Sequence, residues 1–107
     1  MKRTIFIATT LLITSAAYSE NIDQVLNDAC KEWGNFAEHV MTLRQADKPL
    51  NEIMERVTKT SNNSILKSIV IEAYDSPAFR TEENQEKSIA QFRNKVELSC
   101  FKTANGG

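Results

Sequence analysis

The sequence predicts an all-α fold: a small helical bundle of about four helices, with the first and last helices joined by a disulfide. Three observations predict it. Apolar residues recur at steps of three and four in four separate stretches, and prolines and polar turns separate those stretches. The chain also holds two cysteines, one in the first stretch and one in the last.

Residues 1–19 have the composition of a secretory signal peptide. Two basic residues precede an apolar run from Ile5 to Ile13, and the small residues that follow fit cleavage after Ala17 or Ser19. The apolar run is shorter than the roughly 20 residues that a membrane-spanning helix needs. We therefore expect a signal peptide at 1–19, a single helical domain at 20–103 and a disordered tail at 104–107.

The first expected helix runs from Ile22 to about Arg44. Its apolar stripe comprises Ile22, Val25, Leu26, Ala29, Cys30, Trp33, Ala37, Val40 and Met41. A shorter second helix starts at Pro49, which suits a first helical position because its missing N–H would be unpaired there. The apolar side of this helix is formed by Leu50, Ile53, Met54 and Val57.

The third expected helix is "SILKSIVIEAY", capped by Ser61 or Asn63 and ended by Pro77. Its β-branched residues would also permit a strand, but its interspersed polar residues favour a helix. The last helix begins with Thr81 as N-cap, and its stripe consists of Ile89, Phe92, Val96 and Cys100.

The two cysteines, Cys30 and Cys100, lie on apolar faces near the two ends of the exported chain. In an oxidising compartment such a pair predicts a structural disulfide. Closing a loop of about 70 residues would stabilise the fold by about 4 kcal/mol in the chain-entropy model. A catalytic dithiol would have the Cys-x-x-Cys spacing, which this chain lacks.

Charge and motifs argue against several classes of function. The net charge is −1, and it becomes −3 once the two basic residues of the signal peptide are removed, so we expect no nucleic-acid partner. The sequence holds no phosphate-binding glycine loop and no Gly-x-Ser-x-Gly elbow. Two cysteines and one histidine, His39, are too few for a structural zinc. We therefore expect neither an enzyme nor a cofactor or metal, and no membrane span after cleavage.

Trp33 has two interpretations that the sequence leaves open. It is either a core residue beside Cys30 or an anchor for a partner, because tryptophan and arginine are enriched at interface hot spots.

The other candidate partner-binding residues lie in two corners between helices. Arg44, Asp47 and Lys48 form a charged corner before the second helix, and Phe79 and Arg80 lie between the last two helices. Loops on rigid scaffolds often carry binding residues. Phe79 is also expected to fill the core at this point.

Three segments carry a resemblance to a known group: "LRQADKPLNEIM", "IVIEAYDSPAF" and "IAQFRNKVELSC". With Cys30 and Cys100, they make the chain resemble small exported two-cysteine helical proteins of bacterial and bacteriophage genomes. The positions that match are Arg44, Pro49, Leu50, Ile71, Ala73, Tyr74 and Pro77. The resemblance implies the fold and an envelope location, and the group has no reaction attached to it.

In architecture alone the chain is similar to periplasmic acid-stress chaperones of the HdeA type, although its cysteines are placed differently. Three hypotheses follow. The first is a periplasmic protein that binds or inhibits another envelope protein, from a host or a phage gene. The second is an acid-activated chaperone, because acid would neutralise the 14 carboxylates and leave a strongly positive chain. The third, which the residues favour least, is a cell-wall hydrolase.

Overall fold

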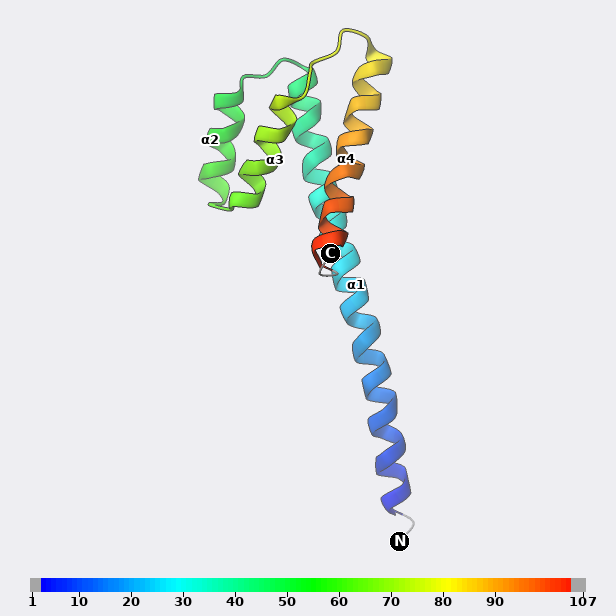
Figure 1. Ribbon diagram of the computed structural model, residues 1–107. Helices are drawn as coiled ribbons and strands as arrows, with labels where there is room; N and C mark the ends of the chain where they lie inside the picture. Colours follow the sequence, from blue (N-terminus) through cyan, green and yellow to red (C-terminus); the bar gives the residue numbers. More distant parts are fainter. Residues whose placement is uncertain (1–2, 105–107) are drawn as a thin grey trace.

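The computed structural model describes residues 3–104, and for residues 3–21 it describes the helical backbone alone. Four helices follow one another within these residues (Figure 1): α1 (Arg3–Gln45), α2 (Leu50–Thr60), α3 (Ser64–Asp75) and α4 (Glu82–Ala104). No strand occurs in the described part of the chain. The prediction of an all-α fold with four helices is therefore confirmed. None of the described helices is long and apolar enough to cross a membrane.

Two ends of the chain differ from the expected boundaries. The backbone of α1 begins at Arg3, so the helix runs continuously through the region where cleavage is expected. Ala104, which the sequence assigns to the tail, is the last residue of α4. Residues 105–107, the remainder of the expected tail, lie outside the described residues.

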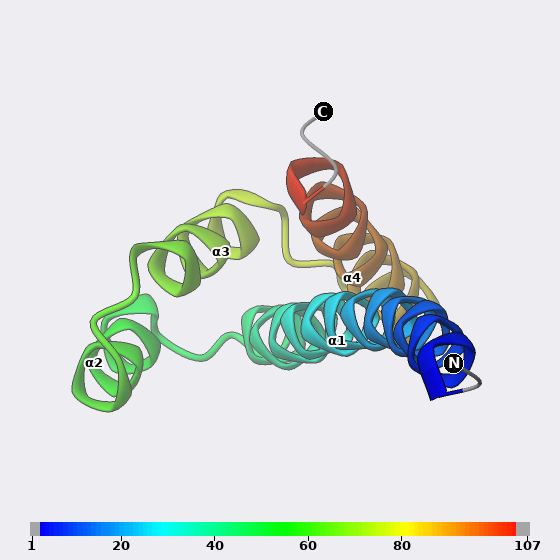
Figure 2. The same cartoon turned by 90° about the horizontal axis from the view of Figure 1, so that it is seen from below.

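The central pair of the bundle consists of α1 and α4. Helix α4 lies along the C-terminal part of α1, α3 packs on α1, and α2 packs on α3 as the outermost helix (Figures 1 and 2). The N-terminal part of α1 projects beyond the end of α4 (Figure 1). Because no helix covers this part, Ile22 and Val25 are 51% and 68% exposed, although the apolar stripe predicts that they are buried.

The core is built from one apolar face of each helix. Its buried members are Ala37, Val40 and Met41 on α1, Ile53 and Val57 on α2, Ile69, Val70 and Ala73 on α3, and Phe92 and Val96 on α4. Those of α1, α2 and α4 belong to the predicted stripes, and those of α3 lie at the same helical spacing within its expected segment. Leu50, which the sequence assigns to the buried side of α2, is instead 41% exposed.

Side chains cap two of the helices as the sequence predicts. The Asn63 side chain accepts a hydrogen bond from the N–H of Ile65 at 2.8 Å, and the Thr81 hydroxyl accepts one from the N–H of Asn84 at 3.2 Å. The sequence predicts Pro49 at the first helical position of α2, but Pro49 is the N-cap and Leu50 is the first helical residue. The carbonyl of Pro49 accepts the first hydrogen bond of the helix.

The predicted disulfide between Cys30 and Cys100 is confirmed. It joins α1 to the C-terminal end of α4 with a Cα–Cα distance of 5.6 Å, and Cys30 is fully buried. One turn further along α1, the absence of a side chain at Gly34 leaves room for the Glu97 side chain of α4, because a Cβ there would lie only 2.5 Å from Cγ of Glu97.

Ion pairs link α4 to its neighbours beside this contact. Arg93 on α4 pairs with Glu38 on α1 and, at 2.8 Å, with Glu97 on its own helix. The hydrogen bonds to these two carboxylates raise the pKa of Arg93, and the bond to Glu38 contributes most. Lys95 pairs with Glu72 and so connects α4 to α3. These pairs are partly exposed, and we expect each to add little to stability.

We predict that replacing both cysteines (Cys30→Ala with Cys100→Ala) lowers the free energy of unfolding by about 4 kcal/mol, because the disulfide closes a loop with a sequence separation of 70. Urea unfolding of the oxidised protein and of the variant measures the difference. A reducing agent should lower the stability of the natural chain equally and leave the variant unchanged. A variant within about 1 kcal/mol of the natural chain would contradict the prediction.

Candidate functional site: the joined linkers

The linker between α1 and α2 and the linker between α3 and α4 meet at one end of the bundle (Figure 1). Gln45, the last residue of α1, is only 5% exposed and uses both ends of its amide. Its Nε2 donates to the carbonyl of Pro77 at 3.0 Å, and its Oε1 accepts from the N–H of Phe79 at 2.8 Å. One side chain therefore holds the second linker against α1.

Two further side chains complete this connection. The Nε of Arg44 donates to the carbonyl of Ser76 at 3.0 Å, and its guanidinium carbon lies 5.4 Å from the centre of the Tyr74 ring. The hydroxyl of Tyr74 donates to the carbonyl of Lys48 at 2.6 Å, which ties the first linker to α3. We call Arg44, Gln45 and Tyr74 the linker joint.

The chain leaves α1 through a tight turn at Asp47. Its φ of 59° is in the left-handed region, which non-glycine residues adopt at some cost and aspartate more readily than most. The N–H of Asp47 donates to the carbonyl of Arg44, and that of Lys48 donates to the carbonyl of Leu43. This pair of bonds is the Schellman arrangement, which ends the helix and directs the chain toward α2.

The exposed residues at this end of the bundle include two large apolar and two basic side chains: Leu50, Phe79, Lys48 and Arg80. We call these four the linker platform. Leu50 is 41% and Phe79 37% exposed. Among the residues that the structure describes, neither Lys48 nor Arg80 forms an ion pair.

The expectation that Phe79 fills the core is wrong. The backbone of Phe79 is held on both sides, since its N–H bonds to Gln45 and its carbonyl accepts from Nε2 of Gln85 at 2.8 Å. Its side chain is exposed, and Tyr74 and Ile89 pack against the buried core instead.

The structure separates the six candidate partner-binding residues into three environments. Lys48, Phe79 and Arg80 are exposed members of the linker platform, and Asp47 is exposed in the turn beside it. Arg44 is half-buried and committed to the linker joint. Trp33 is half-buried and packs against the core, one turn from Cys30. The core interpretation of Trp33 is the one that its packing supports.

Gln45 and Tyr74 are the residues of the joint that the sequence analysis does not assign to it. The sequence does indicate that Gln45 is buried, because it continues the apolar stripe of α1 four residues after Met41. A polar residue in such a position needs a buried hydrogen-bonding partner. The signal for Tyr74 is weaker, since a tyrosine at the end of a helix also fits ordinary packing.

The environment of Tyr74 shifts its ionisation. Burial raises the pKa of Tyr74 above its ordinary value of 10, while the charge of Arg44 lowers it and that of Glu52 raises it further. Because the pKa is higher in the folded state, the stabilisation by the neutral phenol is complete below pH 10. It is lost as the pH rises through the value in the folded state.

We predict that Tyr74→Phe lowers the free energy of unfolding by about 1 kcal/mol at pH 8, because the hydrogen bond to Lys48 is lost. Above pH 10 the difference between the natural chain and the variant should shrink, since a phenolate cannot donate this bond. Urea unfolding of both proteins at several pH values tests this. A difference that stays constant from pH 8 to pH 11 would contradict it.

The described residues contain no group of three or more histidine, cysteine, aspartate or glutamate side chains arranged to hold a metal ion. His39, the only histidine of the chain, is exposed on α1. In comparisons with protein-family models, with curated proteins and with solved structures, the chain matches none of them.

Proposed function

We propose that this chain is an exported protein of the bacterial periplasm that acts by binding another envelope protein through the linker platform. The observation that carries the proposal is Phe79, an aromatic side chain that is 37% exposed on a loop whose backbone is hydrogen-bonded to Gln45 and Gln85. An exposed aromatic side chain on an ordered loop is a common anchor of a protein interface.

The composition of the linker platform supports this proposal. Arginine and aromatic side chains contribute much of the binding energy of protein interfaces, and the platform offers Arg80 beside Phe79. Leu50, the first residue of α2, adds exposed apolar surface. Because the linker joint already orders both linkers, a partner would not have to immobilise them. That saving in conformational entropy favours binding.

Export is supported by the disulfide, because such bonds form and persist in oxidising compartments such as the periplasm. The N-terminal composition described above is a second, independent indication of a signal peptide.

We predict that Phe79→Ala combined with Arg80→Ala weakens capture of the partner at least tenfold. Oxidised protein, immobilised and exposed to envelope extract at neutral pH, is compared with the variant by mass spectrometry of the retained proteins. One dominant partner is expected for the natural chain. Helix content, measured by circular dichroism, should be the same in both because neither side chain belongs to the core.

The matched control is Leu98→Ala combined with Lys102→Ala, which removes an exposed apolar side chain and a positive charge from α4 outside the platform. It should retain the partner. Equal capture by the platform variant and the control would contradict the assignment of the platform.

An acid-activated chaperone is the second candidate, and the ion pairs between helices favour it. Glu38 and Glu72 supply the negative partners that tie α4 to α1 and α3. Strong acid neutralises both carboxylates, which removes these connections, and the chain as a whole becomes strongly positive. This candidate predicts binding of an apolar dye and of many client proteins near pH 2. A cooperative native fold without dye binding at that pH would exclude it.

A further inference from the structure

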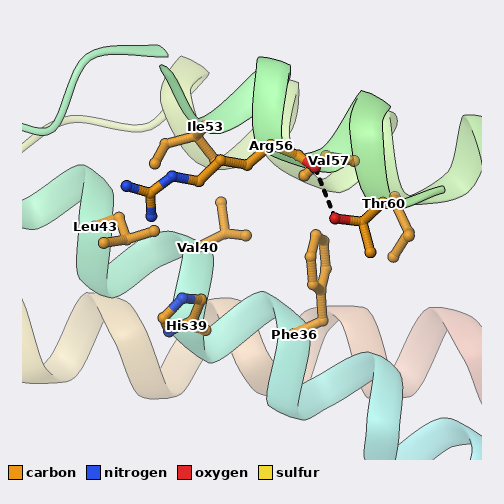
Figure 3. Close-up of a pocket in the computed structure, with 9 residues that line it drawn as sticks. Phe36, His39, Val40, Leu43, Ile53, Arg56, Val57 and Thr60 are labelled. Atoms are coloured by element: carbon orange, nitrogen blue, oxygen red, sulfur yellow. Dashed lines mark hydrogen bonds between the residues drawn. The ribbon is translucent and has the colours of Figure 1, made fainter. Parts of the chain in front are cut away.

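A groove of about 290 Å³ lies between α1 and α2, apart from the linker platform (Figure 3). It exists because α2 packs mainly on α3 and not on α1. Its apolar lining consists of Phe36, Val40, Leu43, Ile53, Val57 and Leu66, and the remaining lining residues are His39, Arg56 and Thr60. None of the described residues that line it is acidic.

The groove is polar at one end and apolar along its length. Figure 3 shows the guanidinium of Arg56 and the ring of His39 on the Leu43 side of the groove, with Phe36 and Thr60 at the other end. Both basic side chains are exposed. The nearest competing anion is Glu52, whose Oε1 lies 2.9 Å from a terminal nitrogen of Arg56. Because both partners are largely exposed, this ion pair is weak, and the guanidinium can turn to another anion.

The walls of the groove favour an alkyl chain over a peptide. Both walls are helices, whose backbone groups bond within the helix, and the hydroxyl of Thr60 already donates to the carbonyl of Arg56 at 2.9 Å. A peptide would bury amide groups without partners there. An alkyl chain has no such groups. The volume of about 290 Å³ is at the lower end of the range for small-ligand pockets, which fits a medium alkyl chain rather than a long one.

From this shape and this charge complementarity we propose that the groove binds a medium-chain fatty acid. The alkyl chain lies among the side chains of Val40, Val57 and Phe36, and the carboxylate lies at Arg56 and His39. The site is independent of the linker platform, so that either assignment can fail without the other.

The test is a titration of the oxidised full chain with sodium decanoate, kept below its micelle concentration and followed through the NMR signals of His39. As the only histidine of the chain, it reports directly on the polar end of the groove. We expect its signals to shift and saturate. Arg56→Gln should weaken binding about three- to fivefold, and Glu52→Gln should strengthen it, because it removes the competing anion.

Lys59→Gln is the matched control: Lys59 lies on the same helix, pairs with Glu55 at 3.2 Å and does not line the groove. It should bind decanoate like the natural chain. Absence of a His39 shift would overturn the proposal, and so would equal binding by the Arg56 and Lys59 variants. Decyl maltoside, which has a neutral head, should bind more weakly than decanoate, and a peptide with an apolar C-terminus should not bind. Binding of decyl maltoside as tight as that of decanoate, or saturable binding of the peptide, would also overturn it.

Discussion

The disulfide between Cys30 and Cys100 is the interaction on which the rest of this fold depends. The core of a chain this small gives only a modest net stability, so one covalent link that closes a loop with a separation of 70 residues is a large part of the total. The link also fixes α1 against α4, and α3 packs on α1 while α2 packs on α3. Beside the link, the absence of a side chain at Gly34 leaves room on α1 for the Glu97 side chain of α4.

The disulfide joins α1 to the C-terminal end of α4, and at the opposite end of α4 the hydrogen bonds of Gln45 make a second connection to α1. Together with Arg44, Gln45 holds the linker that leads into α4 against the end of α1, and Tyr74 brings the other linker to the same place. Buried polar groups with all their partners satisfied define a single arrangement of the chain around them. The buried hydrogen bonds of the linker joint therefore order the exposed linker platform. The groove between α1 and α2 lies open at the side where the helices are least tightly packed.

Local patterns predict most of the fold. The helical stripes, the caps Asn63 and Thr81 and the disulfide all follow from residue types and spacing. The linker joint does not, because Gln45 meets residues 32 and 34 positions away, and a contact of that separation leaves no periodic signal. The exposure of Phe79 is not predictable for the same reason: its apolar character suggests burial, whereas its backbone bond to the distant Gln45 holds it at the surface. The exposure of Ile22 likewise depends on where α4 ends, which the stripe on α1 cannot show.

The central claim is that the two linkers form one ordered surface, and the exchange rate of the Phe79 amide hydrogen tests it most directly. This amide lies in a loop, and its hydrogen-bond acceptor is the side chain of Gln45. The account predicts strong protection in the oxidised protein, loss of that protection in Gln45→Leu, and unchanged protection in Gln91→Leu, which alters an exposed glutamine on α4. Exchange in the natural chain as fast as in an unstructured peptide would contradict it.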